Sequence, residues 1–257
     1  LNIFKNVSLI ACEDTRQTKK IMSKFEFTNN LTSFNKHNYK KKMPQIISDL
    51  NSGKSIALVS DAGMPSICDP GEELIREARS NAIKTICIPG ACAAITALVS
   101  SGLPSSKFIF EGFLPKKKSE REKILAEISR NEKTTILFES PQRLKKLLIE
   151  LKEYCGGERE IIVSRELTKK FEENIGKNIE EVISYFDGIE VLGEVTIVIK
   201  GRTNSKEINI CNKLEIKQEL YELTQAGLNL SAASKYLAKK NNLKKSIIYN
   251  MYKITDF

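Results

Sequence analysis

Short runs of apolar, β-branched residues alternate with amphipathic helical patterns from the start of the chain to about residue 112. The runs that predict strands are Val7–Cys12, Leu31–Phe34, Ser55–Val59, Lys84–Ile88 and Phe108–Gly112. The segments that predict helices are Thr15–Phe25, Tyr39–Asn51, Gly71–Ser80 and Ala91–Ser101. Because strands that alternate with helices form βαβ units, the pattern predicts an α/β domain over residues 1–112, with a largely parallel sheet covered on both faces.

A second α/β domain is predicted over residues 113–202, after the linker Glu111–Lys118. Its expected elements are helix Ser119–Arg130, strand Thr134–Glu139, helix Gln142–Tyr154, strand Ile161–Arg165 and strand Val195–Lys200. The last two are long β-branched runs, which favours a mixed sheet.

The remaining residues, 203–257, predict a small basic helical unit. Its three amphipathic segments are Leu214–Gln225, Ser231–Lys240 and Lys245–Tyr252. Gly227 can end the first helix and Ser231 can cap the second. Such a unit resembles a helix-turn-helix, which favours contact with nucleic acid. A packing or dimerisation appendage with a solvated lysine face explains the pattern equally well.

Composition narrows the chemistry. The formal charge of the 257-residue chain is +9, which favours polyanionic partners, nucleic acid first. The six cysteines form no C-x-x-C pair, and the single histidine, His37, lies in a polar region typical of a surface. These features argue against a zinc site and a histidine-based triad, and favour reduced thiols. No run of eighteen apolar residues occurs, so we expect a cytoplasmic protein without a membrane partner.

Two loops rich in small residues follow predicted strands, SDAGMPSICDPG from Ser60 and IPGACAAITA from Ile88. The first places Asp61-Ala62-Gly63 at the carboxyl end of a strand, where open α/β sheets bind ligands. Asp69 is expected to cap the next helix, with Pro70 at its first position. Both loops are also explained by an ordinary connection and by tight helix packing. Neither a G-x-G-x-x-G fingerprint, a P-loop nor a G-x-S-x-G elbow is present.

Seven segments occur in the order found in one enzyme family: ACEDTRQTKKIM, SFNKHN, SDAGMPSICDPG, IPGACAAITALVSSGLP, FEGFLPKK, FESPQRL and SRELTKKFEE. On these segments the chain, from about Leu1 to Gly201, resembles the ribosomal RNA small subunit methyltransferase I family of the tetrapyrrole methylase superfamily. The resemblance implies a two-domain α/β fold with S-adenosylmethionine in a cleft between the domains. It also implies 2′-O-methylation of a cytidine in small-subunit (16S) ribosomal RNA, a homodimer and no metal.

The resemblance implies a set of cofactor-binding residues. They are Asp61, Ala62, Gly63, Ile67, Cys92, Ala93, Ser140 and Arg165. Asp61 could accept hydrogen bonds from the amine or ribose of the cofactor, and the peptide groups of both loops could meet its adenine and methionine portions. The implied catalytic residues are Glu139 and Glu166. For Glu139 and Arg165, an ion pair between the domains is an equally good explanation.

A ribose hydroxyl needs its proton removed, so a general base or a solvent relay is expected. The candidates are Glu139, Glu166, Asp14 and Glu13, although Glu13-Asp14 could instead cap the following helix. The basic residues expected to contact RNA phosphates are Arg16, Lys19, Lys20, Lys116, Lys117, Lys118, Lys239, Lys240, Lys244 and Lys245.

The chain departs from the family pattern in one respect, because no T-P-I-G-N loop occurs in it. We therefore expect it to lack a leading strand, loop and helix of about thirty residues. Since that loop lines the cofactor cleft, the chain as given should bind S-adenosylmethionine poorly, and tight binding in a calorimetric titration would refute this. Two other functions stay open: C-methylation of a tetrapyrrole, and a non-catalytic role in RNA binding or ribosome assembly.

Overall fold

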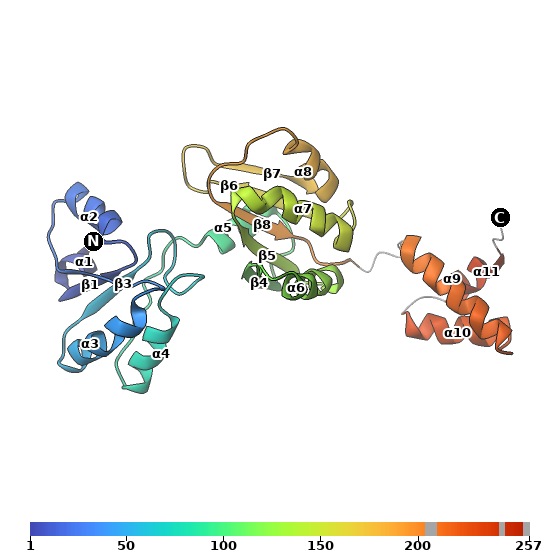
Figure 1. Cartoon of the computed structure of the whole chain (residues 1–257), viewed down its shortest axis with the longest axis horizontal. Helices are drawn as coiled ribbons and strands as arrows, with labels where there is room; N and C mark the ends of the chain where they lie inside the picture. The colour runs from blue at the N-terminus through green and yellow to red at the C-terminus, as the bar shows by residue number, and fades with distance from the viewer. Residues whose placement is uncertain (204–209, 242–244, 254–257) are drawn as a thin grey trace. The chain divides into compact units, whose positions relative to one another are not determined.

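The computed structural model describes residues 1–203, 210–241 and 245–253. The chain forms two compact units, Leu1–Arg202 and Thr203–Phe257 (Figure 1). The predicted division of residues 1–202 into two domains stays a prediction. The five cysteines whose side chains are described, Cys12, Cys68, Cys87, Cys92 and Cys155, are free thiols.

A three-stranded parallel sheet begins the first unit, with the strand order β2-β1-β3. Its strands are β1 (Leu9–Cys12), β2 (Leu31–Ser33) and β3 (Ile56–Val59). The helices around it are α1 (Asn2–Asn6), α2 (Thr15–Lys24), α3 (Tyr39–Asn51) and α4 (Glu72–Ser80). Ile46 of α3 and Leu74 of α4 pack against Ala11 and Phe34, while α2 lies on the other side of the strands (Figure 1). The predicted parallel arrangement is confirmed.

Two strand predictions for this sheet are wrong. Lys84–Ile88 forms no strand, and the side chains of Ile86 and Ile88 are 66% and 53% exposed. Lys84–Ile88 joins no sheet in the described residues, although β3 pairs with β1 on one side and leaves its other edge unpaired there. The composition of a run therefore does not by itself make it a strand. The run at Phe108 does form a strand, but in the second sheet.

The second sheet is mixed, as predicted, and has the strand order β4-β5-β8-β6-β7. Its strands are β4 (Phe108–Phe113), β5 (Thr134–Glu139), β6 (Glu160–Arg165), β7 (Glu173–Asn178) and β8 (Val195–Ile199). Only β4 and β5 are parallel. The sequence gives no signal for β7, a half-exposed edge strand of polar residues and glycine, nor for the short helix α8 (Ile179–Tyr185).

Helices cover both faces of this second sheet. On one face, α6 (Lys118–Arg130), α7 (Pro141–Cys155) and α8 enclose a core that includes Leu125, Leu144, Leu148 and Ile197. On the other face, α5 (Ala93–Ser101) packs its small residues against Ile136 and Val198.

The second unit contains α9 (Ile210–Gln225), α10 (Leu230–Lys240) and α11 (Lys245–Lys253). Leu220, Leu237 and Ile248 pack together in its core. Gly227, at a φ of +95°, lies just beyond the end of α9, as predicted. The predicted cap at Ser231 is wrong, because the Asn229 side chain accepts the Ala232 amide and α10 begins at Leu230. No helix within the described ranges has the length and apolarity needed to cross a membrane.

Candidate functional site

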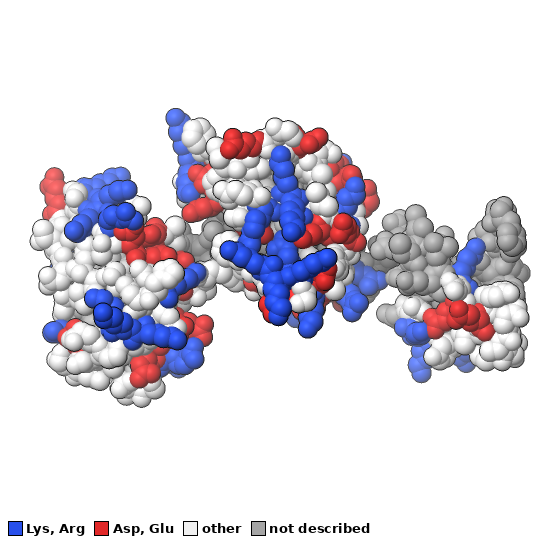
Figure 2. All heavy atoms as spheres, in the orientation of Figure 1, with Lys and Arg blue, Asp and Glu red and all other residues white. Residues whose placement is uncertain are grey.

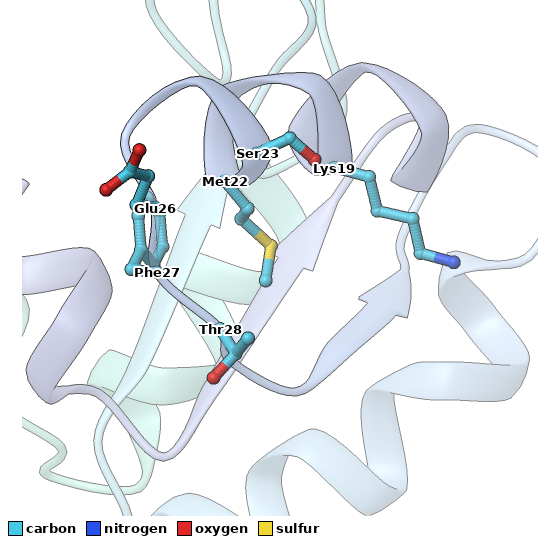
Figure 3. A pocket seen from close by; sticks show the side chains of 6 residues that line it. All are labelled: Lys19, Met22, Ser23, Glu26, Phe27 and Thr28. Atoms are coloured by element: carbon cyan, nitrogen blue, oxygen red, sulfur yellow. The ribbon is translucent and has the colours of Figure 1, made fainter.

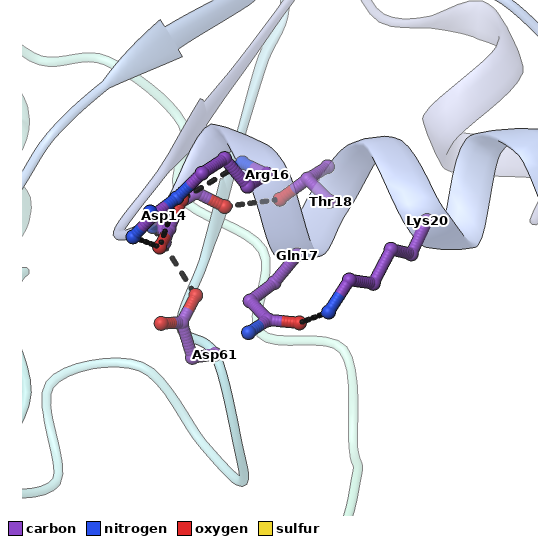
Figure 4. A network of polar contacts seen from close by, with 6 residues as sticks. All are labelled: Asp14, Arg16, Gln17, Thr18, Lys20 and Asp61. Atoms are coloured by element: carbon purple, nitrogen blue, oxygen red, sulfur yellow. Dashed lines mark hydrogen bonds and ion pairs between the residues drawn. The ribbon is translucent and has the colours of Figure 1, made fainter.

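The carboxylates of Glu13, Asp14 and Asp61 meet where β1 and β3 end. Figure 4 shows two of them, Asp14 and Asp61. Asp14 caps α2 by accepting the Arg16 amide at 2.8 Å, which confirms the capping alternative. The Asp14 amide donates to Asp61 Oδ1 at 3.2 Å, and the Asp61 amide donates to Glu13 Oε2 at 3.4 Å. These reciprocal bonds hold the two strand ends together, and they leave the second carboxylate oxygen of Asp61 free of protein donors in the described part of the chain.

The guanidinium of Arg16 holds the Asp14 carboxylate in its charged form. Arg16 Nε lies 3.0 Å from both oxygens of Asp14, and its hydrogen bonds lower the pKa of Asp14 from 3.8 to about 2. Because the folded pKa is the lower one, this interaction stabilises the fold above pH 3.8 and is lost as the pH falls through about 2.

We expect Asp14→Asn to keep the cap, since asparagine caps helices well, but to remove this pH dependence. The stability advantage of the wild type over the variant should shrink as the pH falls from about 4 to about 2. Thermal melts at stepped pH values check this, together with a carboxyl NMR titration of Asp14. An Asp14 that titrates at its ordinary pKa would contradict the prediction.

The loop from Ser60 to Gly71 is held in a specific conformation. Ser60 Oγ donates within the loop towards the carbonyls of Ala62 and Gly63. Two non-glycine residues, Ser66 and Cys68, have positive φ values of 71° and 64°. Such conformations persist only where the surroundings impose them, and they cluster at functional sites.

The expected helix start at Asp69 and Pro70 is wrong. The cap of α4 is Gly71, at a φ of +151°, and the helix begins at Glu72. Asp69 instead turns toward Ser60 and Glu13, and its burial, followed by the charge of Glu13, raises the pKa of its carboxyl. A backbone conformation that only glycine adopts readily overrides the preference of aspartate for the cap.

Three segments that are distant in the sequence meet around this loop. A Cβ on Gly63 would lie 3.7 Å from the Ala91 carbonyl oxygen, so the two predicted cofactor loops touch. Cys68 accepts a hydrogen bond from the Phe113 amide at the end of β4, and its carbonyl accepts Lys36 Nζ at 2.8 Å. The arrangement joins the carboxyl ends of β3 and β4 to the start of α5.

The other cofactor candidates lie along the same segments. Cys92 is the N-terminal cap residue of α5 and packs partly into its core, while Ala93 is exposed at the first turn. The side chain of Ile67 is 38% exposed, which leaves it accessible as an apolar contact. The exposed peptide groups and small side chains fit a flat nucleoside that approaches the backbone closely. Their role in binding stays a prediction.

Ser140 and Arg165 lie at one end of the second sheet, where its strands terminate. Glu139 and Arg165 both pair with Val195 in the strand register, from opposite sides, and Phe113 pairs with Phe138 on β5. The carboxyl ends of β4, β5 and β6 therefore lie at the same end of the sheet. Ser140 follows β5 directly and its amide donates to Glu139 Oε1 at 2.8 Å.

Glu139 forms a buried ion-pair network within the second sheet and its helices. Arg143 Nε donates to Glu139 Oε1 at 2.7 Å, and Arg121 Nη1 lies 3.6 Å from Glu139 Oε2. Arg121 also pairs with Glu150 at 2.7 Å. The predicted ion pair between the domains is wrong, because Arg165 pairs with Glu173 on the neighbouring strand. Arg121 is the residue that sequence reasoning missed, since nothing in the sequence shows that its side chain is buried.

Glu166 joins the loop after β6 to the turn before β8. Its backbone has a φ of 52°, and its Oε1 accepts both Lys169 Nζ and the Glu194 amide. The bond from Lys169 is the main cause that lowers the pKa of Glu166. A Cβ on Gly193 would overlap the Glu166 carboxylate, so this arrangement requires glycine there.

The predicted RNA-contacting residues are mostly exposed, but several are paired. Arg16 binds Asp14, Lys117 binds Glu120 and Lys118 lies 3.8 Å from Glu122. Other pairs join Lys20 to Gln17, Lys240 to Glu219 and Lys245 to Ser231. Lys116 and Lys239 are exposed, and Lys244 lies outside the described residues.

One hollow lies away from these loops (Figure 3). It has a volume of about 360 Å³ and is lined by Lys19, Met22, Ser23, Glu26, Phe27 and Thr28, at the end of α2. None of the predicted cofactor residues lines it. Within the described residues, no group of His, Cys, Asp and Glu side chains could hold a metal ion.

Comparison with known proteins places this architecture in a family. The family model of the tetrapyrrole (corrin/porphyrin) methylases matches residues 1–183. The chain is 39% identical over 247 residues to ribosomal RNA small subunit methyltransferase I of Synechocystis sp., a match that covers 96% of this chain and 88% of that protein. It is also 39% identical over 257 residues to the protein of that name from Bacillus subtilis, which covers 99% and 88%.

Solved structures show the same fold. The methyltransferase CobJ matches with a TM-score of 0.58 at 14% identity, over 78% of this chain and 85% of that one. Uroporphyrin-III C-methyltransferase from Thermus thermophilus, complexed with S-adenyl homocysteine, matches with a TM-score of 0.53 at 14% identity, over 77% and 88%. The chain therefore belongs to the tetrapyrrole methylase family, and within it to the ribosomal RNA small subunit methyltransferases I, which makes it an S-adenosylmethionine-dependent methyltransferase.

Proposed function

We propose that this methyltransferase transfers a methyl group to the ribose 2′-hydroxyl of a cytidine in small-subunit (16S) ribosomal RNA. The observation that carries the proposal is the contact between the Asp61-Ala62-Gly63 loop and the Ala91 loop, in a chain whose close relatives are named for small-subunit ribosomal RNA. The proposal keeps two further expectations, a cytoplasmic location and a homodimer.

The cofactor supplies an electrophilic methyl group when it is bound. The free carboxylate oxygen of Asp61 could accept hydrogen bonds from its amine or ribose hydroxyls, and the peptide groups of the two loops would line its adenine and methionine portions. Ser140 and Arg165, at the carboxyl ends of β5 and β6, would close the site on the side opposite the two loops. Holding the donor in line with the sugar oxygen supplies much of the rate gain.

The general base proposed for the sugar hydroxyl is Glu13. Of the four candidate carboxylates, Glu139, Glu166 and Asp14 are held in ion pairs with arginine or lysine. Their carboxylate oxygens are already occupied by these cations. Glu13 has no ion pair in the part of the chain described, and it lies beside Asp61 through the bond from the Asp61 amide to its Oε2. Its carboxylate can therefore receive the hydroxyl proton next to the cofactor loop.

Methyl transfer to isolated subunits tests the function. Small subunits from a strain without this activity, incubated with an excess of the full chain and with enough labelled S-adenosylmethionine to offset its weak binding, should yield labelled 2′-O-methylcytidine after RNA digestion. Label in a porphyrinogen substrate would support C-methylation of a tetrapyrrole instead. Binding to subunits without any label would support a non-catalytic role in assembly.

Replacing Glu13 with Gln should lower kcat about 100-fold, because general bases typically contribute at least that factor. The variant keeps the acceptor for the Asp61 amide, so the affinity for S-adenosylmethionine should stay within a few fold. Asp14→Asn, one residue away, is the matched control and should leave kcat nearly unchanged. A Glu13→Gln enzyme with wild-type kcat would exclude this base.

A further inference from the structure

Helix α7 carries three of its four positive charges near its N-terminal end, where a helix least favours them. Its first turn has no acidic residue, and Arg143, Lys145 and Lys146 all lie within its first two turns. Helix α6 differs, because Glu120 lies in its first turn and Lys117 and Lys118 pair with acidic residues of the helix. The positive end of the helix dipole favours aspartate and glutamate there. Helix stability therefore does not explain Lys145 and Lys146 at the start of α7.

Four lysines on and before these helices are exposed and have no ion pair within the described ranges. They are Lys116, Lys123, Lys145 and Lys146, which we call the α6–α7 basic surface. Their neighbours differ, since Lys117, Lys118 and Lys152 pair with Glu120, Glu122 and Glu180. Lysine and arginine side chains gather over α6 and α7 (Figure 2). Glu127 and Glu153 are the exposed acids of these helices that have no ion pair in the same ranges.

The surface begins at the candidate site. Helices α6 and α7 follow the parallel strands β4 and β5, and both pack on the same face of the sheet. Their N-terminal ends therefore lie at the end of the sheet that carries Ser140 and Arg165. A polyanion bound along the two helices would extend to that end of the sheet.

We propose that the α6–α7 basic surface binds the ribose-phosphate backbone of the ribosomal RNA substrate and guides the target nucleotide to the end of the second sheet that carries Ser140 and Arg165. The inference rests on the proposed function and extends it to a surface outside the chemistry. The lysines contact phosphates, so they supply affinity and orientation rather than sequence recognition. Their free charge is what counterion release requires.

The salt dependence of subunit binding tests this surface. The triple variant Lys123→Ala, Lys145→Ala, Lys146→Ala should reduce the magnitude of the negative slope of log K against log salt by about 2, because each lost phosphate contact contributes about 0.7–0.9. The matched control removes the same net charge from paired lysines: Lys54→Ala, Lys152→Ala, Lys177→Ala, whose partners are Asp49, Glu180 and Glu181. The control should keep the wild-type slope. Equal slopes in both triple variants would overturn the proposal.

A crosslinking experiment shows whether the α6–α7 basic surface binds RNA or a protein. A photoreactive p-benzoylphenylalanine in place of Lys146 should give adducts with ribosomal RNA when subunits are added. Adducts with ribosomal proteins alone would overturn the proposal. The methylation assay is a separate readout, because it follows methyl transfer by the wild-type chain rather than binding by the variants. A chain that binds subunits with the expected slopes but transfers no methyl group would refute the proposed function and leave the surface intact.

Discussion

Replacing Glu139 with Ala should lower the free energy of unfolding by about 3 kcal/mol. The Glu139 side chain is fully buried, and Arg121 beside it is only 9% exposed. Removing the carboxylate would leave the Arg121 guanidinium with Glu150 as its remaining partner. It would also remove the acceptor of the Ser140 amide. A buried charge that loses a partner is costly because water cannot replace it.

Guanidinium denaturation followed by circular dichroism measures this effect, since the chain has no tryptophan. Glu72→Ala is the control, because it removes an exposed pair with Arg76 on a helix surface. Exposed pairs of this spacing contribute about 0.3–0.5 kcal/mol. If the two variants lose the same stability, the Glu139 network does not stabilise the fold.

Gly71→Ala should cost about 2–6 kcal/mol and disturb the Ser60–Gly71 loop, through two separable causes. Its φ of +151° is strained for any residue with a Cβ, which costs on the order of 1–3 kcal/mol. The new Cβ would also overlap Ser66 Oγ and lie 2.9 Å from Leu58 Cδ2. Such overpacking adds about 1–3 kcal/mol when the neighbours cannot move freely.

Gly53→Ala separates the two causes. Gly53 has a φ of +87°, and a Cβ there would meet no atom within 4 Å. This variant should show the cost of backbone strain alone, and the difference between the variants then gives the cost of the clash. Hydrogen exchange at the amides of residues 60–71 should rise in Gly71→Ala and stay unchanged in Gly53→Ala. Equal losses of stability would show that the loop accommodates the methyl group.

The regular elements could largely be predicted from the sequence, because apolar periodicity sets strands and helices locally. The misses have particular physical causes. Lys84–Ile88 has the composition of a strand but joins no sheet in the described residues, whereas β7 pairs along β6 without the composition. The N-termini of α4 and α10 moved by one or two residues because Gly71 and Asn229 supply the better cap.

The candidate site divides in the same way. Family motifs placed Asp61 and the Ala91 region on loops, and the structure brings those loops together. The partners of each carboxylate could not be predicted from the sequence, because they are side chains from other helices and strands. Glu139 meets Arg121 from α6, and Glu166 meets the turn at Gly193. These contacts change which carboxylate is available as a base, and so they change the mechanism proposed.

The hydrogen bonds at Cys68 have a consequence for how the two substrates influence one another. One residue of the Ser60–Gly71 loop is tied both to Lys36 and to the last residue of β4, from which the chain leads into α6. If the Ser60–Gly71 loop shifts when the methyl donor binds, it would either break the bond to Phe113 or move the start of α6 with it. Since thermodynamic linkage is reciprocal, occupancy by the methyl donor and docking of the nucleic acid would then alter each other's affinity by the same factor.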